Sequence, residues 1–563
     1  MGKKNMDDLI WKWTLANAIE HEGSAEVGAV IGKVMAEKPE LKSEVQVIKS
    51  KIEEIVSEVN DMSTEKQKIK LEEIGAPERE KKKEEGLKEL PESERYSTVV
   101  TRFAPNPNGP LHLGHTRPSI LSHEYARRND GKFILRFEDT NPSNAKKEMY
   151  EMIREDLKWL GLDWDEEYIQ SDRMGIYYEY AKKLLEKTHA YICTCSSKRF
   201  KELRDEETAC PCRNLSSKEN ISRWESMKKG EYDEGEAVVR IKTNLENPNP
   251  ALRDWPALRI VKDKHPRTGS DYYVWPLYNF SVAIDDHELG ITHVLRGKEH
   301  EVNEQRQRQL FDHLNWKYPT ALQIGRLSVS GTVLSKTQIM WGMSEGKYEG
   351  YDDVRLGTLS ALRRRGIMPE ALREIVLDAG LTKSNSTLSL DTLHKKNRRI
   401  IDEKANRYFF VPEPQKILIR DAPEEKEVDL RLHPNDAERG NRTLPLEQTD
   451  GKLKAWIAKN DVKDMEKGSL IRLKDLFNFR ITSIKPLEAE FEGYELLDTP
   501  KIQWVSGNPI ETNIIMPDAQ ERKGYAEPEA EKLKEGEIIQ FERFGFVRID
   551  GKEPELTAVY THS

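Results

Sequence analysis

The chain has 563 residues, of which 34% are charged and 37% hydrophobic, and its formal net charge at pH 7 is −9. A chain of this length is expected to form several domains, and its acidic balance excludes an overall basic surface for nucleic acid, so any such contact must come from local patches. No stretch approaches the roughly 18 apolar residues of a membrane span, and no apolar segment follows Met1. We therefore expect a cytoplasmic protein that does not contact a membrane.

Residues 1–75 are predicted to form a helical N-terminal extension. Residues 76–97 follow as a charged linker, since 13 of the 20 residues from 76 to 95 are charged. The extension could dock a partner protein or could simply lengthen the fold. Its prediction rests on apolar residues at helical spacing, namely Ile31, Val34 and Met35, and then Val45, Ile48, Ile52, Ile55 and Val56.

The segment 98–190 begins with a predicted strand at 98–103, followed by a loop, a helix and a second strand at 133–137. The loop reads PNPNGPLHLGH at 105–115. In it, Pro105 and Gly109 shape the turn, and Gly114 lets a flat group approach the backbone. A helix N-terminus favours a bound polyphosphate, and His112 and His115 would add two donors directed at one spot. This loop is therefore a candidate ATP site.

All four cysteines fall in the segment 191–290, which we expect to be an insertion into an α/β domain. Two close pairs of thiolates predict a closed tetrahedral site, for which zinc is the default metal. Reduced free thiols are the alternative, and disulfides are not expected because nothing in the chain suggests secretion. A zinc ion here would be structural. The predicted ligands are Cys193, Cys195, Cys210 and Cys212.

The segment 291–395 is predicted to complete the α/β domain, and it carries VLSKT at 333–337. Strands alternate with helical patterns from 98 to about 395, which predicts a doubly wound, Rossmann-like sheet that binds ligands at the carboxyl ends of its strands. From 396 to 563 the pattern changes to short β-like runs, such as those at 416–420, 468–473 and 536–541. Strands at this density predict an all-β region of antiparallel barrels.

The two loop motifs together resemble the signature pair of the class I aminoacyl-tRNA synthetases, known as HIGH and KMSKS. The copies here are 112–115 (HLGH) and 333–337 (VLSKT), and Thr337 departs from the usual final Ser or Arg. The resemblance implies that ATP is a substrate, that Mg²⁺ assists, and that Lys336 neutralises the β- and γ-phosphates as pyrophosphate leaves. Such chemistry needs positioning and charge neutralisation rather than a general base. The implied catalytic residues are His112, His115, Ser335 and Lys336, with Pro105, Gly109 and Gly114 also binding ATP.

Residues 278–300, YNFSVAIDDHELGITHVLRGKEH, resemble the glutamyl and glutaminyl branch of that class. A buried γ-carboxylate needs a cation and a γ-amide does not, so Arg296 favours glutamate. The glutamyl members also carry Arg at this position, whereas the glutaminyl members carry a small residue. The resemblance adds Arg102, Asn106, Glu138 and Tyr278 to the glutamate pocket. Asn106 stands where bacterial members commonly have Ser, and Glu138 could instead cap the helix that follows it.

Residues 350–380 are similar to the glutaminyl and the archaeal or eukaryotic glutamyl enzymes, whose two C-terminal barrels bind the anticodon. Residues 25–41 resemble the helical tail of the tRNA-dependent amidotransferases, which is associated with tRNA binding. The resemblance implies ATP-dependent ligation of L-glutamate to tRNA through a glutamyl-adenylate, with the cysteine insertion near the tRNA acceptor end. The alternatives are a glutaminyl enzyme, a non-catalytic tRNA-binding protein, and a nucleotidyltransferase, which the barrel-like tail disfavours. Whether tRNA(Gln) is charged as well as tRNA(Glu) is left open.

Overall fold

The computed structural model describes residues 3–20, 23–38, 45–75, 87–329 and 332–563. The chain divides into two compact units, 1–86 and 87–563. Part of the predicted linker, 76–86, lies outside the described residues. Among the described helices, none is both long enough and apolar enough to cross a membrane.

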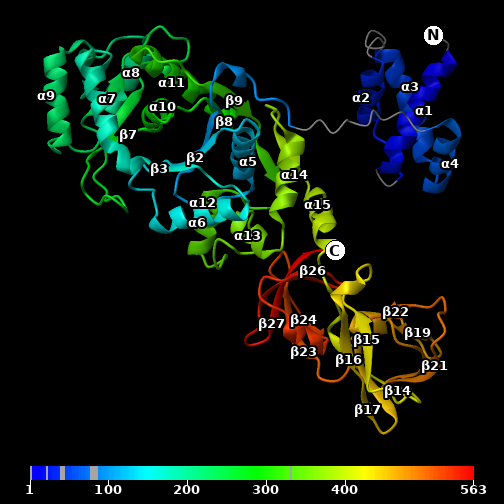
Figure 1. The fold of residues 1–563 in the computed structure, drawn as a ribbon. Coiled ribbons are helices and arrows are strands. Elements are labelled where there is room, and N and C mark those ends of the chain that lie inside the picture. Colours follow the sequence, from blue (N-terminus) through cyan, green and yellow to red (C-terminus); the bar gives the residue numbers. More distant parts are fainter. Residues whose placement is uncertain (1–2, 21–22, 39–44, 76–86, 330–331) are drawn as a thin grey trace. The chain divides into compact units, whose positions relative to one another are not determined.

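The first unit consists of helices in its described residues, as the apolar spacing predicts (Figure 1). Its longest helix, α1, packs against the other three. Val34 and Ile52 are fully buried between the helices. The side-chain amide of Gln67 donates hydrogen bonds to the carbonyls of Gly23 and Val59, which joins α4 to the connection between α1 and α2 and to the end of α3. The four helices are α1 (Lys3–Glu20), α2 (Val27–Glu37), α3 (Val45–Asn60) and α4 (Thr64–Ile74).

A parallel sheet forms the centre of the second unit. Strands β1 (Val100–Phe103), β2 (Lys132–Phe137) and β3 (Glu166–Ile169) pair in that order, and β8 (His293–Gly297) pairs with β9 (Thr320–Ile324). The backbone N–H of Thr292, just before β8, donates to the carbonyl of Val100 on β1 at 2.9 Å. The spatial order is therefore β3-β2-β1-β8-β9, and it reverses between β1 and β8. Open α/β sheets bind ligands at such a reversal.

Helices cover both faces of this sheet, which confirms the doubly wound prediction. Phe133, Leu135 and Phe137 of β2 pack into one large core with α5, α6 and α14, whereas the intervening Arg136 contacts α10 on the opposite face. A short parallel pair, β10 (Leu327–Val329) and β11 (Ser386–Leu388), follows the sheet. The helices are α5 (Leu113–Arg128), α6 (Lys147–Trp159), α7 (Met174–Glu186), α10 (Tyr278–Glu288), α11 (Glu301–Leu314), α12 (Lys336–Ser344), α13 (Leu359–Arg364), α14 (Pro369–Ala379) and α15 (Leu390–Asp402).

The cysteine-containing segment forms an antiparallel sheet of its own, inserted between α7 and α10. Its order is β4 (Ala190–Cys193), β5 (Val238–Ile241), β6 (Pro256–Ile260) and β7 (Val274–Pro276). Helices α8 (Ser197–Asp205) and α9 (Ser217–Lys228) lie between β4 and β5 in the chain. Three buried tryptophans, Trp224, Trp255 and Trp275, fill the core of this region.

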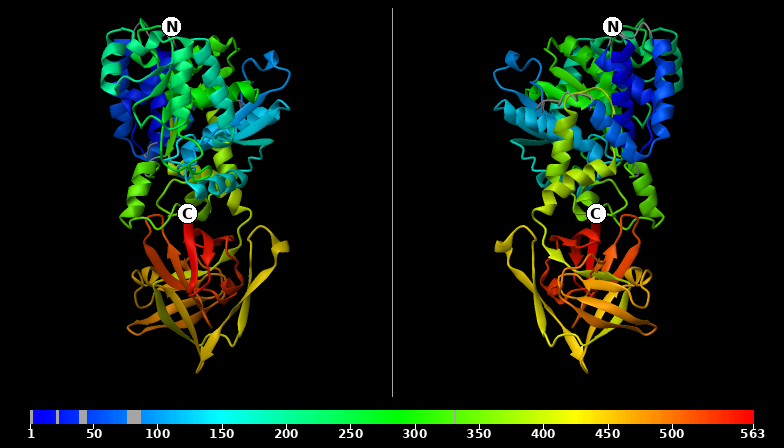
Figure 2. Two further views of the ribbon diagram at one scale, coloured as in Figure 1. Left: turned by 90° about the vertical axis from the view of Figure 1, so that its left-hand side faces the viewer. Right: turned by 90° about the vertical axis from the view of Figure 1, so that its right-hand side faces the viewer.

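The C-terminal region contains two seven-stranded sheets and no long helix among its described residues (yellow to red in Figure 2). One sheet has the order β17-β18-β14-β21-β20-β19-β22. Trp456 on β18 and Val505, just beyond β22, exchange backbone hydrogen bonds and nearly close this sheet into a barrel. Its strands are β14 (Pro414–Arg420), β17 (Glu447–Thr449), β18 (Lys452–Ala458), β19 (Leu470–Leu473), β20 (Asn478–Ile484), β21 (Leu487–Gly493) and β22 (Lys501–Ile502).

The other sheet has the order β12-β25-β26-β27-β23-β24-β13. Its two edge strands follow each other in the chain and are separated only by Phe409, so the sheet curls back on itself. The predicted all-β region is thereby confirmed. The remaining strands are β12 (Arg407–Tyr408), β13 (Phe410–Pro412), β23 (Ile510–Ile515), β24 (Glu521–Ala526), β25 (Ile538–Phe541), β26 (Gly545–Gly551) and β27 (Leu556–His562), with a separate hairpin of β15 (Glu427–Arg431) and β16 (Asn441–Pro445).

Candidate active site

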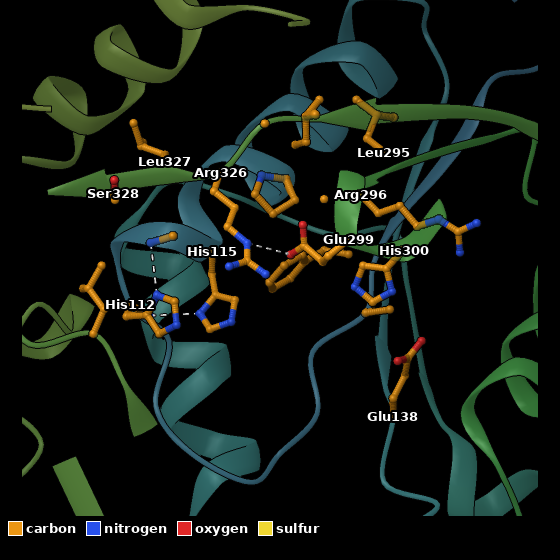
Figure 3. Close-up of a pocket in the computed structure, with 18 of the residues that line it drawn as sticks. His112, His115, Glu138, Leu295, Arg296, Glu299, His300, Arg326, Leu327 and Ser328 are labelled. Carbon is orange, nitrogen blue, oxygen red and sulfur yellow. Dashed lines mark hydrogen bonds and ion pairs between the residues drawn. The ribbon is translucent and has the colours of Figure 1, made fainter. Parts of the chain in front are cut away.

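A cavity of about 550 Å³ lies at the carboxyl ends of β1 and β8, where the strand order reverses. Figure 3 shows the two histidines of the HLGH motif on one side and Arg296, His300 and Glu138 on the other. The volume is in the range of ordinary small-molecule sites. Eight residues predicted from the sequence line this cavity: Arg102, His112, Gly114, His115, Glu138, Tyr278, Arg296 and Ser335.

The two histidines cap the helix that begins the site. His112 is the N-cap of α5, and its Nδ1 accepts from the N–H of Gly114 at 3.0 Å. Nδ1 of His115 in turn accepts from the N–H of His112 at 3.1 Å, and the two ring centroids are 3.9 Å apart. This reciprocal arrangement is a capping box made of histidines rather than the usual Ser and Glu.

The capping box determines what these rings can do. Because each Nδ1 accepts a backbone N–H, each neutral ring must carry its proton on Nε2. Burial lowers the pKa of His112 to about 4 and, with the neighbouring His112, that of His115 to about 3, so both rings are neutral at pH 7. Among the described residues, no group bonds either Nε2. Two neutral N–H donors are therefore available to a ligand.

Two glycines keep this part of the site open. A Cβ on Gly114 would lie 2.9 Å from Cε1 of His112, so a side chain there would displace the ring. A Cβ on Gly109 would lie 3.1–3.4 Å from the Lys336 side chain, which shows that Lys336 packs over the PNPNGP loop. Pro105 anchors the same loop, because its carbonyl accepts from the N–H of Glu138 at 3.0 Å. The two motifs therefore meet although they are far apart in the sequence.

Gly357 and its neighbours connect the two motifs, a role that the sequence did not predict. The carbonyl of Gly357 accepts from Leu113 in the first motif at 3.1 Å, and its N–H donates to Val333 in the second motif at 3.1 Å. A Cβ on Gly357 would lie 2.3 Å from Leu334 Cδ2. Residues 356–359 thus bridge the two motifs through backbone hydrogen bonds.

The lysine of the second motif lies at the start of a helix. Ser335 is the N-cap of α12 and Lys336 is its first residue. Burial and the nearby Lys146 lower the pKa of Lys336, which indicates that two cations lie close together. Lys146 was not predicted from the sequence, where it appears as one of many lysines.

The opposite side of the cavity is built on buried ion pairs. Nε and Nη2 of Arg102 donate to the two carboxylate oxygens of Asp286 at 3.1 and 3.3 Å. Nη1 of Arg136 also donates to Asp286, at 2.7 Å, and its Nη2 donates to Glu138 at 3.1 Å. Asp286, on α10, therefore connects the two predicted pocket residues Arg102 and Glu138. Burial raises the pKa of Glu138, while the two arginines oppose that shift.

Arg296, at the end of β8, has different partners. Its Nη1 donates to Oε1 of Gln307 at 2.8 Å and its Nη2 donates to the hydroxyl of Tyr318 at 3.0 Å. Its shortest ion pair among the described residues, to Glu304, is 3.9 Å. Tyr278 also lines the cavity, and burial raises its pKa to about 12, so it is a neutral phenol.

Four predicted residues do not line the cavity. Pro105 and Gly109 belong to the loop that shapes the cavity and Lys336 begins α12, whereas Asn106 is exposed. Among the lining residues that were not predicted from the sequence, three carry ionisable side chains: Glu299, His300 and Arg326. The signal that could have found Arg326 is its place just beyond β9, because the carboxyl ends of all parallel strands meet at one edge.

The four cysteines form a compact cluster. Each offers a sulfur, and the four sulfurs lie within 4.8 Å of one another; the Cys193–Cys210 and Cys195–Cys212 separations are 3.9 and 4.0 Å. None is in a disulfide. Sulfurs in a tetrahedral zinc site are about 3.8 Å apart, given Zn–S bonds of about 2.3 Å, so the spacing fits a metal. Although burial opposes it, hydrogen bonds from Thr194 and Arg223 lower the pKa of Cys212, which favours the thiolate.

Residues 98–403 match the family model described as tRNA synthetases class I (E and Q), catalytic domain. Residues 405–495 and 481–550 match two models for the anti-codon binding domain of the same family. The match to the catalytic domain begins at β1 and ends just beyond α15, so it includes the whole cavity.

Relatives match over almost the entire chain. A protein named glutamate–tRNA ligase from Pyrococcus furiosus is 50% identical over 576 residues, which cover 99% of this chain and 100% of the relative. A protein of the same name from Methanothermobacter marburgensis is 44% identical over 563 residues, again covering 99% and 100%. A crystal structure of a glutamate tRNA ligase from Elizabethkingia meningosepticum in complex with its amino acid aligns with a TM-score of 0.42, at 23% identity, over 55% of this chain and 70% of that chain.

Proposed function

The chain belongs to the class I tRNA synthetases of the E and Q type, and we propose that it ligates L-glutamate to tRNA. It is an ATP-dependent aminoacyl-tRNA ligase. The observation that carries the choice of glutamate is the identity of 44–50% with relatives of that name, over 99% of the chain. The presence of Arg296 in the cavity agrees with that choice, because a buried γ-carboxylate needs a cation.

The histidine side of the cavity is the proposed ATP site. The neutral Nε2–H groups of His112 and His115 would donate to phosphate oxygens, and Gly114 and the α5 N-terminus would let the polyphosphate approach the backbone. Lys336, with Ser335 at the helix start, would neutralise the departing pyrophosphate, aided by Mg²⁺. The residues of the PNPNGP loop, Pro105 and Gly109 among them, would shape this site rather than react.

The arginine side is the proposed glutamate site. Arg296 and Arg102 would bind the substrate carboxylates, Glu138 would pair with the α-ammonium, and Tyr278 would donate a hydroxyl hydrogen bond. The α-carboxylate would then face ATP and attack its α-phosphorus, giving glutamyl-adenylate and pyrophosphate. Asn106 stays a prediction, since it lies in the loop and outside the cavity lining.

The remaining parts of the chain are proposed to engage tRNA. The C-terminal sheets match the anti-codon binding domains of the family, and the cysteine insertion would lie near the acceptor end. Cys193, Cys195, Cys210 and Cys212 would hold a structural zinc ion that keeps this insertion folded. We further propose that residues 1–75 contact tRNA or a protein partner, with the cytoplasm as the site of action. Replacing Cys212 by Ser should release zinc, measured by a chromogenic chelator, and lower the thermal stability.

A charging experiment tests the amino acid. The protein is incubated with ATP, labelled glutamate or glutamine, and either tRNA(Glu) or tRNA(Gln). Glutamate should become attached to tRNA(Glu), and its attachment to tRNA(Gln) would identify a relaxed enzyme that supplies an amidotransferase. Attachment of glutamine instead would contradict the proposal.

A variant of the proposed glutamate site makes the test specific. Arg296→Gln should lose most glutamate activation, measured by glutamate-dependent pyrophosphate exchange in the presence of tRNA. Lys182→Gln is the control, because Lys182 is exposed and pairs with Glu186 on the surface of α7, before the cysteine-containing segment. Unchanged glutamate activation in Arg296→Gln would show that the pocket is assigned wrongly.

A further inference from the structure

Two buried arginines line the same cavity but differ in their partners. Arg102 and Arg296 are each 5% exposed. Arg102 makes a two-pronged ion pair with Asp286, so its charge is compensated within the protein. Both Nη atoms of Arg296 bond neutral groups instead, and its Nε has no hydrogen-bond partner in the described structure.

Gln307 and Tyr318 hold Arg296 together. Oε1 of the buried Gln307 accepts from Nη1 of Arg296 at 2.8 Å and from the hydroxyl of Tyr318, also at 2.8 Å. The Tyr318 hydroxyl accepts from Nη2 of Arg296 at 3.0 Å. The three groups thus form a closed triangle of hydrogen bonds that restrains the guanidinium.

This triangle holds the guanidinium in position without neutralising it. Burial raises the pKa of Tyr318 to about 12, so the phenol is uncharged at pH 7, and Gln307 carries no charge at any pH. The shortest ion pair of Arg296 among the described residues is the 3.9 Å contact with Glu304, whose other oxygen already accepts from Arg308 at 2.9 Å. Although burial opposes it, Tyr318, Tyr278, Asp286 and Glu304 together raise the pKa of Arg296, so the guanidinium stays charged. None of them makes a close ion pair with it, and a ligand carboxylate would add that direct pairing.

We propose that Gln307 and Tyr318 are specificity-determining positioning residues: they orient Arg296 and leave its positive charge for the side-chain carboxylate of the substrate. The inference rests on the proposed function, since it explains how this site would prefer glutamate to glutamine. Glutamine offers a neutral amide, which cannot compensate the charge. A carboxylate at position 307 would compensate it internally and remove the advantage of the acidic substrate.

The central test is Gln307→Glu, which keeps both acceptor contacts and adds one negative charge. Pyrophosphate exchange in the presence of tRNA is measured against glutamate, glutamine and ATP concentration. The KM for glutamate should rise about 10- to 100-fold, while kcat and the KM for ATP change less than about 3-fold. The preference for glutamate over glutamine, as a ratio of kcat/KM, should fall by a similar factor.

Two further variants separate charge from packing. Tyr318→Phe removes one hydrogen bond but no charge, so it should raise the KM for glutamate about 3- to 10-fold and reduce the glutamate preference far less than Gln307→Glu does. Glu304→Gln removes the distant carboxylate and should leave the KM for glutamate equal or about 2-fold lower. Adding a negative charge in Gln307→Glu should therefore raise the KM for glutamate, whereas removing one in Glu304→Gln should not. A change that only loosened the packing of the pocket would raise this KM in both variants.

The outcomes decide between distinct conclusions. If the wild-type protein does not activate glutamate, the proposed function fails. If it does, and Gln307→Glu keeps both its thermal stability and its glutamate preference, the inference about Gln307 is wrong while the function stands. If Gln307→Glu is unfolded, the other two variants decide. A higher KM for glutamate in Glu304→Gln overturns the inference, and so does a loss of the preference for glutamate over glutamine in Tyr318→Phe.

Discussion

The two sides of the cavity are built in opposite ways. On the histidine side, His112 and His115 come from one short stretch, cap their own helix and are neutral at pH 7. The arginine side gathers Arg102, Arg136 and Asp286 from three elements separated by up to 184 residues, and its groups are charged. The histidine pair is local and neutral, whereas the arginine side is assembled from distant elements and depends on charge.

This difference predicts how each side fails. Removing a neutral histidine donor leaves a space that water can enter. Such a change should therefore lower the reaction rate more than it lowers the free energy of unfolding. A buried charge that is removed leaves its partners uncompensated, so the cost should fall on folding and substrate binding together.

The largest effect should come from Asp286→Asn. Arg102 and Arg136 would then lose the anion they share, and the free energy of unfolding should fall by about 3–5 kcal/mol, with a KM for glutamate raised far more than that for ATP. Urea unfolding and steady-state kinetics measure both. The control is Asp172→Asn, whose ion pair with Arg267 is on the surface and should matter by less than about 1 kcal/mol. Equal losses of unfolding free energy in Asp286→Asn and Asp172→Asn would show that the buried charges of the arginine side matter no more than a surface ion pair.

His115→Ala should affect the reaction more than folding. Loss of one preorganised donor should lower kcat for adenylate formation by about 10²- to 10³-fold, with little change in the KM for glutamate. His123→Ala is the matched control, because His123 lies on the same helix and bonds Asp163 away from the cavity. That variant should lose stability and keep kcat. If His115→Ala keeps full kcat, the histidines are only a helix cap.

Gly114→Ala tests the same side with a steric change. The added Cβ would lie 2.9 Å from Cε1 of His112, so the ring must move, and kcat should fall roughly 10-fold, which corresponds to about 1.4 kcal/mol. Gly175→Ala in α7 is the control, since a Cβ at that position would have nothing within 4 Å. The control should leave kcat unchanged and slightly raise the helix stability. Equal kcat values for Gly114→Ala and the wild-type protein would show that the reaction does not depend on the position of the His112 ring.

The smallest effect concerns pH. Because burial lowers the pKa of His112 to about 4 and that of His115 to about 3, kcat should show no histidine titration from about pH 6 to 8. In the unfolded chain these histidines take up protons near their ordinary pKa of 6.5. Their contribution to stability is thus present above pH 6.5 and is lost as pH falls toward their folded pKa values.

Urea unfolding at about pH 7.5 and 5.0 measures this contribution. His115→Ala should show a smaller loss of unfolding free energy between the two pH values than the wild-type protein does. An apparent pKa near 6.5 in the kcat profile that disappears in His115→Ala would instead show that the ring titrates in the folded enzyme.

Much of the fold could be predicted because it rests on local patterns. The strands at 98–103 and 133–137, the helix after the first motif and the density of short strands after 396 all appear in the structure with shifts of a few residues. Helix α6 begins only at Lys147, because the N–H of Lys146 donates to the carbonyl of Pro107 in the loop at 105–115. That contact is long-range and leaves no periodic signal.

The sequence was enough to predict the groups that lie close together along the chain. These are His112, Gly114 and His115 at one helix start, and the four cysteines in two pairs. Hydrogen bonds within a helix turn depend on spacing along the chain, which can be read directly. Folding in three dimensions was needed to show that Asp286 and Arg136 link Arg102 to Glu138. It was also needed to show that Gln307 and Tyr318 hold Arg296. Charge compensation depends on distance and burial in space, and neither is written in the order of the residues.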